Sequence, residues 1–217
     1  MKILIEISGG FDSGAAALKS KEMFLDSEFY GFMVNYGQIP FEIEYKKAKE
    51  FCKRENIKLK VIEIKNLFDS GTVKGNDNKD ENGIANIYTP FRNGVILSSA
   101  ISYAENIGAE YIITGSKGLN DDGGPYSFKD SLLPFYELMN AVVNYAVYKK
   151  IKILPILTYK RNIKMTKKEV YKYLNDKGYG INDFWNCFNS NEKICGVCNN
   201  CIELNKLRGV FNDSSKN

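Results

Sequence analysis

The 217-residue chain contains no histidine. This absence excludes Ser-His-Asp and Cys-His nucleophilic triads, HExxH metalloproteases and the zinc deaminases, all of which need an imidazole. Acid–base chemistry near neutral pH must therefore use lysine, tyrosine, a perturbed carboxylate or the substrate itself. An excess of one charge is also missing, because 30 Lys and Arg residues accompany 26 Asp and Glu residues, for a net charge of +4. This scattered balance argues against nucleic acid as the main partner.

Long apolar runs are missing as well, since no stretch approaches the roughly 20 residues that cross a bilayer. The apolar N-terminus is interrupted by Glu6 and then by glycines, unlike a signal peptide. We therefore expect a cytoplasmic protein without a membrane partner. In such a reducing compartment, closely spaced cysteines indicate a metal or redox site rather than disulfides.

Hydrophobic periodicity predicts strands that alternate with helices. The predicted strands cover residues 2–7, 28–35, 58–64, 111–114 and 151–155. The predicted helices cover residues 13–23, 41–56, 93–107 and 130–149, and a further helix begins with a capping box at residues 166–169. Residues 69–86 and 116–128 are predicted to be polar, glycine-bearing loops, the first of them longer than an ordinary connection. This alternation indicates an α/β fold with a doubly wound parallel sheet.

The first predicted strand leads into the loop Ser-Gly-Gly-Phe-Asp-Ser at residues 8–13, directly before a helix. Ligands of open α/β sheets bind at this edge, and glycines let the backbone approach them closely. Free N–H groups and the dipole at the start of the helix favour an anion, the Ser8 and Ser13 hydroxyls add donors, and Asp12 suits a phosphate-bridging Mg²⁺. The loop has neither the Walker A lysine nor GxGxxG spacing. A plain turn with structural glycines is the alternative, but the complete motif favours phosphate binding.

Four of the five cysteines lie near the C-terminus, three of them in CxxCxxC spacing. They are Cys187, Cys195, Cys198 and Cys201. Four thiolates suit a closed, tetrahedral, structural Zn²⁺ site. An iron–sulfur cluster is the alternative, but a ferredoxin-type run continues differently, and the sequence favours zinc. The fifth, Cys52, is predicted to be a small core residue.

Ser-Gly-Gly-x-Asp-Ser is the motif of the PP-loop ATP pyrophosphatases, a superfamily that this chain resembles. Together with the C-terminal cysteines, the motif resembles more narrowly the 7-cyano-7-deazaguanine synthases of queuosine biosynthesis. The resemblance extends over most of the chain. Its further segments are Asn-Tyr-Gly-Gln at residues 35–38, Thr-Pro-Phe-Arg-Asn at residues 89–93, Tyr-Ile-Ile-Thr-Gly at residues 111–115 and Cys-Phe at residues 187–188.

The resemblance implies an enzyme that converts 7-carboxy-7-deazaguanine and ammonia to the amide and then to the nitrile. Each step passes through an adenylate and consumes ATP to AMP and pyrophosphate. It further implies an adenine nucleotide alpha-hydrolase-like domain at residues 1–180 and a zinc-binding segment at residues 181–217, with Mg²⁺, a structural Zn²⁺ and a homodimer. The implied catalytic residues are Asp12 and Arg92. The implied ATP-binding residues are Ser8, Gly9, Gly10, Phe11, Asp12, Ser13, Gly14, Asn35, Arg92, Asn93 and Gly115.

The half of the site expected to hold the acceptor departs from the family. Residues 39–40 are Ile-Pro where the family has basic residues, and residues 124–129 read Gly-Pro-Tyr-Ser-Phe-Lys in place of Gly-Tyr-Pro-Asp-Cys-Arg. Gly14 and Ala15 replace hydroxyl residues after the loop. The candidates for binding the substrate are Tyr36, Gln38, Asp121, Asp122, Tyr126 and Lys129. Those in the loop at residues 116–128 are equally well explained as solvated residues.

Three other functions stay open at this stage. A divergent PP-loop ligase would stop at the amide or join the activated deazaguanine acid to another amine, on a protein or a nucleic acid. A tRNA-thiolating enzyme would carry an iron–sulfur cluster, although the modest net charge argues against a large tRNA footprint. A catalytically silent nucleotide-binding module would need no Asp12.

Overall fold

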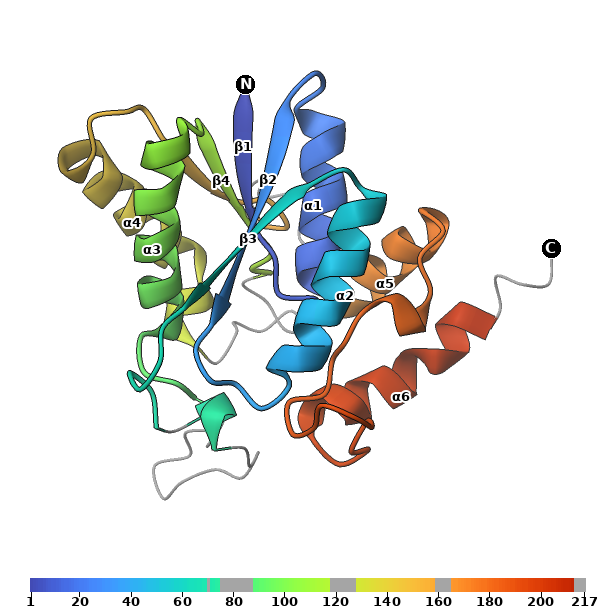
Figure 1. Cartoon of the computed structure of the whole chain (residues 1–217). Coiled ribbons are helices and arrows are strands. Elements are labelled where there is room, and N and C mark those ends of the chain that lie inside the picture. Colours follow the sequence, from blue (N-terminus) through green and yellow to red (C-terminus); the bar gives the residue numbers. More distant parts are fainter. Residues whose placement is uncertain (70, 75–87, 118–127, 159–164, 213–217) are drawn as a thin grey trace.

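One parallel sheet of five strands organises the protein (Figure 1). The structure, a computed structural model, describes residues 1–69, 71–74, 88–117, 128–158 and 165–212, with side chains of the last helix up to residue 207. The strands are β1 (Lys2–Glu6), β2 (Glu28–Asn35), β3 (Lys58–Glu63), β4 (Tyr111–Thr114) and β5 (Lys152–Pro155). Their order is β3-β2-β1-β4-β5, and all neighbours are parallel. The chain changes direction across the sheet between β1 and β4, where α/β proteins bind ligands.

Helices cover both faces of the sheet, which confirms the predicted doubly wound α/β fold. On one side lie α1 (Phe11–Met23), α2 (Phe41–Arg54), α5 (Lys167–Asp176) and α6 (Asn199–Asn212), and on the other side lie α3 (Arg92–Ile107) and α4 (Leu133–Ala146) (Figure 1). Successive residues of β1 point to opposite faces of the sheet. Ile3 and Ile5 pack with α1, whereas Leu4 packs with α3. In the part of the chain that the structure describes, no helix is long and apolar enough to cross a membrane.

Several helix boundaries differ from prediction, among them the end of α2, which lies at Arg54 instead of residue 56. Helix α1 begins at Phe11, two residues before the predicted start, so the end of the Ser-Gly-Gly loop is itself helical. Helix α4 is shorter than residues 130–149, because a separate 3₁₀ turn occupies Lys129–Ser131 and α4 begins at Leu133, with a proline in its first turn. At its other end the Glu105 carboxylate accepts the N–H groups of Tyr148 and Lys149, and Val147 is extended.

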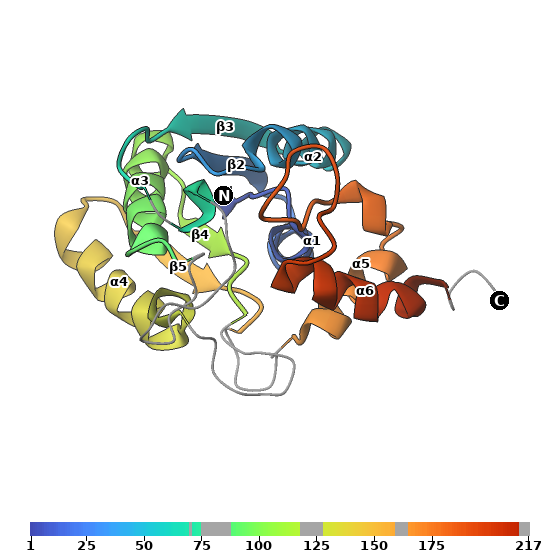
Figure 2. The ribbon, with the colours of Figure 1, turned by 90° about the horizontal axis from the view of Figure 1, so that it is seen from below.

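Helix α6 was not predicted. Of its side chains that the structure describes, those of Cys201 and Leu204 are buried. Figure 2 shows that α6 lies beside α5, and Leu204 joins the core there. The helical pattern is weak because the apolar residues of α6 are not confined to one face, so packing against α5 is needed to stabilise this helix.

Candidate functional site

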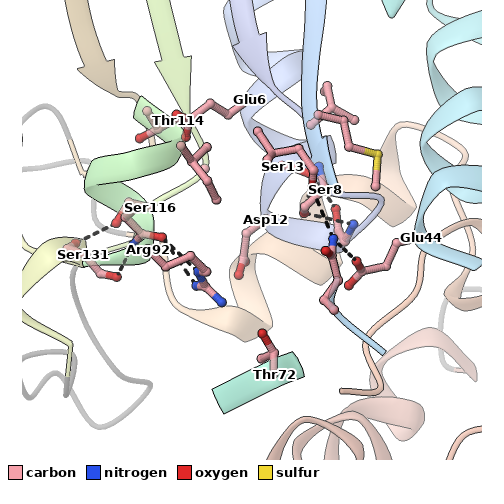
Figure 3. Close-up of a pocket in the computed structure, with 18 of the residues that line it drawn as sticks. Glu6, Ser8, Asp12, Ser13, Glu44, Thr72, Arg92, Thr114, Ser116 and Ser131 are labelled. Atoms are coloured by element: carbon pink, nitrogen blue, oxygen red, sulfur yellow. Dashed lines mark hydrogen bonds between the residues drawn. The ribbon is translucent and has the colours of Figure 1, made fainter. Parts of the chain in front are cut away.

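A cavity of about 330 Å³ lies at the carboxyl ends of β1, β2 and β4. Most of the predicted site residues that the structure describes line it. They are Ser8, Gly10, Phe11, Asp12, Ser13, Tyr36, Gln38, Arg92, Asn93 and Gly115. We call this cavity the sheet-edge pocket; Figure 3 shows it in close-up. The position agrees with the binding crevice expected from the order of the strands.

Hydroxyl groups organise the loop between β1 and α1. The Ser13 Oγ donates to the Gly10 carbonyl at 3.0 Å and accepts the backbone N–H of Ser8 at 3.2 Å. The Ser8 Oγ lies 3.1 Å from the Ser13 Oγ. No side chain caps the start of α1, so the N–H groups of its first turn are not used for capping and suit an anionic ligand.

Glycines permit three close approaches around this loop. Gly9 has a φ of +76°, and a Cβ there would overlap the carbonyl oxygen of Glu44 on α2. A Cβ on Gly115 would lie 2.9 Å from the Asp12 carbonyl, so the end of β4 runs against the loop. Gly14, predicted to bind ATP, is buried under the Phe184 ring and therefore serves packing.

Arg92 begins α3 and extends into the sheet-edge pocket (Figure 3). Its Nη1 donates to the Tyr36 hydroxyl at 3.3 Å, and its Nε and Nη2 both approach the Asn93 Oδ1 at 3.4 Å. Tyr36, with Asp130 and Glu44, raises the pKa of Arg92 despite burial. The preceding Phe91 has a φ of +50°, a left-handed conformation that non-glycine residues seldom adopt. The guanidinium is thus a fixed cation facing the pocket.

Three residues predicted to bind ligands have other roles or positions in the structure: Asn93, Asn35 and Lys129. The Asn93 side chain donates to the Asp130 carbonyl and to the Ser131 Oγ, which ties α3 to the neighbouring turn. The Asn35 side chain accepts the N–H of Gly37 and closes a turn, and Asn35 is not among the lining residues. Lys129 is exposed and does not line the pocket. Three further predicted substrate residues lie outside the described part of the chain: Asp121, Asp122 and Tyr126.

Four carboxylates line the pocket, those of Glu6, Asp12, Glu44 and Asp130, and the last of them accepts the backbone N–H of Asn93. The Asp12 Oδ1 is buried without a hydrogen-bond partner in the described structure, so an oxygen ligand for a cation is present. Glu44 on α2 accepts from the Gln38 Nε2 at 3.3 Å, and burial raises its pKa to about 7 against the opposing effects of Gln38 and Arg92. Burial likewise raises the pKa of Glu6 to about 8, against the opposing charge of Arg92. The available signal for Glu6 was a charged residue at the end of an otherwise apolar strand.

Lys167 is another lining residue that the sequence analysis did not identify. It is the first residue of α5, directly after the Thr166 cap, whose predicted capping box with Glu169 is confirmed. Lys167 is only 4% exposed, and its Nζ lies 2.6 Å from the Glu203 Oε2 of α6. A cation in the first turn opposes the helix dipole, and this mismatch was the signal that Lys167 serves another purpose.

The four C-terminal cysteines form one cluster, as predicted. Their Sγ atoms all lie within 4.8 Å of one another, and all four thiols are free. The Cys195 and Cys201 sulfurs are 3.8 Å apart, which matches the separation of about 3.8 Å that four Zn–S bonds of about 2.3 Å give in a tetrahedron. The Cys198 backbone N–H points to the Cys195 sulfur at 3.4 Å. Burial acts to raise the pKa of Cys195, but such N–H donors outweigh it and lower the pKa to about 7. The cluster therefore fits a single metal ion.

Comparison with known proteins identifies the family of this chain. The family model described as "Queuosine biosynthesis protein QueC" matches residues 2–208. The chain belongs to this family. A 7-cyano-7-deazaguanine synthase of Methanobrevibacter smithii is 31% identical over 234 aligned residues, which cover 100% of this chain and 98% of the relative. A 7-cyano-7-deazaguanine synthase of Carboxydothermus hydrogenoformans is 26% identical and covers 96% of this chain and 98% of the relative. The resemblance drawn from the motifs is thereby confirmed.

Among solved structures, the QueC-family chain is similar to the U34-tRNA thiolase NcsA from Methanococcus maripaludis with its 4Fe-4S cluster. The identity is 16% and the TM-score is 0.49, over 100% of this chain and 68% of that chain. At this level the likeness supports no conclusion about activity or cofactor. The tRNA-thiolating alternative is not favoured, because the near full-length QueC relatives point elsewhere.

Proposed function

We propose that the protein converts 7-carboxy-7-deazaguanine to 7-cyano-7-deazaguanine with ammonia and ATP. One observation carries the proposal: in a QueC-family chain, the uncapped start of α1 and the guanidinium of Arg92 line the same sheet-edge pocket. The first site suits the phosphates of ATP, and the second suits the charge that develops where phosphate and carboxylate react.

The residues of the pocket allow a specific division of roles. The loop and α1 would hold the β- and γ-phosphates, and Asp12 with its unpartnered Oδ1 would hold a Mg²⁺, which neutralises phosphate charge when bound. Arg92 would orient the α-phosphate and the substrate carboxylate, because its planar fork matches both groups. The buried Lys167 ammonium would add a second cation to the phosphate side.

The chemistry then follows in two adenylations. A carboxylate oxygen of the substrate attacks the α-phosphorus, pyrophosphate leaves, and ammonia displaces AMP from the acyl carbon to give the amide. The amide oxygen attacks the α-phosphorus of a second ATP, pyrophosphate leaves again, and the nitrogen gives up one proton. Loss of AMP and of the second N–H proton then forms the nitrile. Glu44 would accept a proton in these steps, since its pKa of about 7 allows both protonation states near neutral pH.

We further propose that the cysteine cluster holds a structural Zn²⁺. None of the four cysteines is among the residues lining the pocket, and three of them are buried. The short sulfur–sulfur separations support a single ion, because an iron–sulfur cluster places several irons between the thiolates. Four free thiols of this kind also support a cytoplasmic location.

A homodimer is also proposed, because α4 carries an exposed apolar stripe. Leu138, Val142 and Tyr145 follow helical spacing and are 69%, 52% and 95% exposed. Such a continuous stripe on a helix is typical of a surface that another protein covers.

The decisive experiment incubates the purified protein with 7-carboxy-7-deazaguanine, ammonium, ATP and Mg²⁺ and identifies products by mass spectrometry. We expect two AMP per nitrile formed. Arg92→Lys should reduce turnover by about 100-fold or more, because a point charge replaces the fork. Arg54→Lys is the matched control, since Arg54 stacks on Tyr179 and does not line the pocket. Accumulation of the amide alone would instead assign the protein to the variant that stops there, and a conjugate with another amine would assign it to the divergent ligases.

A further inference from the structure

Glu6 is an acidic residue at the inner end of an apolar strand. It is the last residue of β1 and pairs in register with Phe32 of β2. Because side chains alternate along the strand, Glu6 shares the face of Leu4 and is directed to the α3 and α4 layer, opposite to Ile5 and Ile7. Phosphate-binding groups of the loop lie on the other side: Figure 3 shows Glu6 near Thr114 and apart from Ser8 and Ser13.

The carboxyl group of Glu6 has no partner of its own in the described structure. Its Oε1 is buried and accepts no hydrogen bond, and no ion pair with Glu6 occurs among the residues described. Asp12 is the other pocket carboxylate with an unpartnered oxygen, but it belongs to the phosphate loop. Glu44 already accepts from Gln38, and Asp130 already accepts from the backbone N–H of Asn93. A buried acceptor without a donor is costly, so a ligand that brings a donor to the Glu6 carboxyl group would relieve this cost.

Apolar and aromatic side chains line the pocket together with Glu6. Phe32, the register partner of Glu6, is buried and stacked on Tyr103 at 5.5 Å between centroids, and Ile96 is a further apolar lining residue. Tyr136 and Thr114 also line the pocket; Figure 3 shows Thr114 beside Glu6, and the charge of Glu6 acts on Tyr136. Apolar walls with one polar group at the end are typical of sites that bind heterocycles.

The two acceptor oxygens of the Glu6 carboxylate favour a guanine-type ring over an adenine ring. A carboxylate presents two acceptors side by side, and a guanine-type edge presents two donors side by side, the ring N1–H and the 2-amino group. An adenine edge presents one donor and one acceptor, which would leave one carboxylate oxygen unsatisfied. The effect of burial on the pKa of Glu6 favours the neutral acid in the free protein, so two N–H donors are also what would stabilise its ionised form.

We propose that Glu6 is a specificity-determining residue that accepts the N1–H and the 2-amino group of the deazaguanine ring. This inference rests on the proposed function and adds a residue that the motif-based candidates did not include. It orients the ring from the α3 side of the sheet, with the ring's carboxylate left to face Arg92.

The test measures binding by calorimetry for three ligands: 7-carboxy-7-deazaguanine, its analogue without the 2-amino group, and ATP with Mg²⁺. The wild type should prefer the deazaguanine acid to the analogue by about 10- to 100-fold, as expected for two hydrogen bonds to a charged group. Glu6→Gln should weaken the binding of the deazaguanine acid by a similar factor and abolish the preference for the acid over its analogue. The affinity for ATP should stay unchanged. Glu63→Gln is the matched control, because Glu63 also ends a strand but is solvent-exposed.

Each other outcome is informative. If the Glu6→Gln variant keeps the preference for the ligand with the 2-amino group, Glu6 does not bind that group and the proposal is wrong. If Glu6→Gln changes only the affinity for ATP, Glu6 faces the adenine instead and the proposal is also wrong. If the wild type binds ATP but neither base, the proposed function itself fails, together with this inference. Glu6→Asp, which withdraws the carboxylate by one methylene, gives the same comparison should the glutamine variant not fold.

Discussion

The backbone N–H of Trp185 donates a hydrogen bond of 2.9 Å to the carbonyl oxygen of Gly9. The same tryptophan donates its indole Nε1–H to the carbonyl of Cys187 at 2.9 Å and packs on the cysteine cluster. One residue therefore touches both the phosphate loop and the segment that would hold the metal. The cysteine segment is thus connected to the loop through Trp185, although no cysteine lines the pocket.

Metal removal should consequently weaken ATP binding as well as the fold. Trp185 is the single tryptophan, so its fluorescence reports on both events. We expect a chelator, or Cys198→Ser, to change the emission spectrum of Trp185 and to lower the melting temperature. Either change should also reduce the affinity for ATP by about tenfold. Cys52→Ala is the control, since Cys52 lies in the core of α2 away from the cluster. Unchanged ATP affinity in a metal-free, folded protein would show that the two regions are uncoupled.

Gly9→Ala should be more damaging than a comparable substitution elsewhere. Both Gly9 and Gly108 have a left-handed φ, +76° and +73° respectively, so alanine costs each about 1–2 kcal/mol of conformational energy. At Gly9 the new Cβ also overlaps the Glu44 backbone, whereas at Gly108 it meets only the flexible end of Lys149. Urea denaturation should therefore show a loss of about 3 kcal/mol or more for Gly9→Ala. Equal losses for both variants would mean that the backbone contact relaxes freely.

Lys167→Met should weaken ATP binding by about 10- to 100-fold, because a buried cation is lost from the pocket. Glu203→Gln should have a smaller effect, since the lysine charge stays in place. The pair formed by Lys177 and Glu22 offers a control at the same 2.6 Å separation but with both side chains about half exposed. Lys177→Met should leave ATP affinity unaltered and change stability by less than about 1 kcal/mol. If the two lysine variants behave alike in ATP titrations, Lys167 has no role toward phosphate.

Glu6→Gln should stabilise the ligand-free protein above neutral pH. The pKa of Glu6 is raised from 4.5 to about 8 by burial, so between these values the folded state keeps a proton that the unfolded state has lost. Wild-type stability therefore falls as pH rises through this range, and the neutral variant avoids the loss. We expect the variant to exceed the wild type by about 2–5 kcal/mol at pH 8.5 and to equal it near pH 4.5, measured by urea denaturation. A difference that does not vary with pH would rule out titration of this carboxyl.

Val142→Asp tests the proposed homodimer. A charge in the middle of the exposed stripe of α4 should shift the protein to a monomer in light scattering without lowering its melting temperature as a folded unit. Lys150→Asp is a control at a nearby polar surface position. A wild type that is already monomeric at micromolar concentration would exclude the dimer.

Features carried by neighbouring residues could be predicted from the sequence. The strand positions follow from short apolar runs, and the observed β2 and β4 match the predicted bounds. The anion loop, the capping box at Thr166 and the cysteine cluster each depend on spacing within a few residues, and the structure has all three arrangements. Helix α6 could not be predicted in this way, because its local helical pattern is weak. Its stability depends on packing against α5.

The sequence by itself determined the fold class, the family, the loop that suits phosphate and the ligand set for a metal, because each is encoded by contiguous residues. Only the tertiary structure revealed that Glu6 ends in the pocket without a partner, that Lys167 reaches the same pocket and that Trp185 is bonded to Gly9. These relationships arise from the order of the strands and from the burial that packing imposes, and no local pattern carries that information.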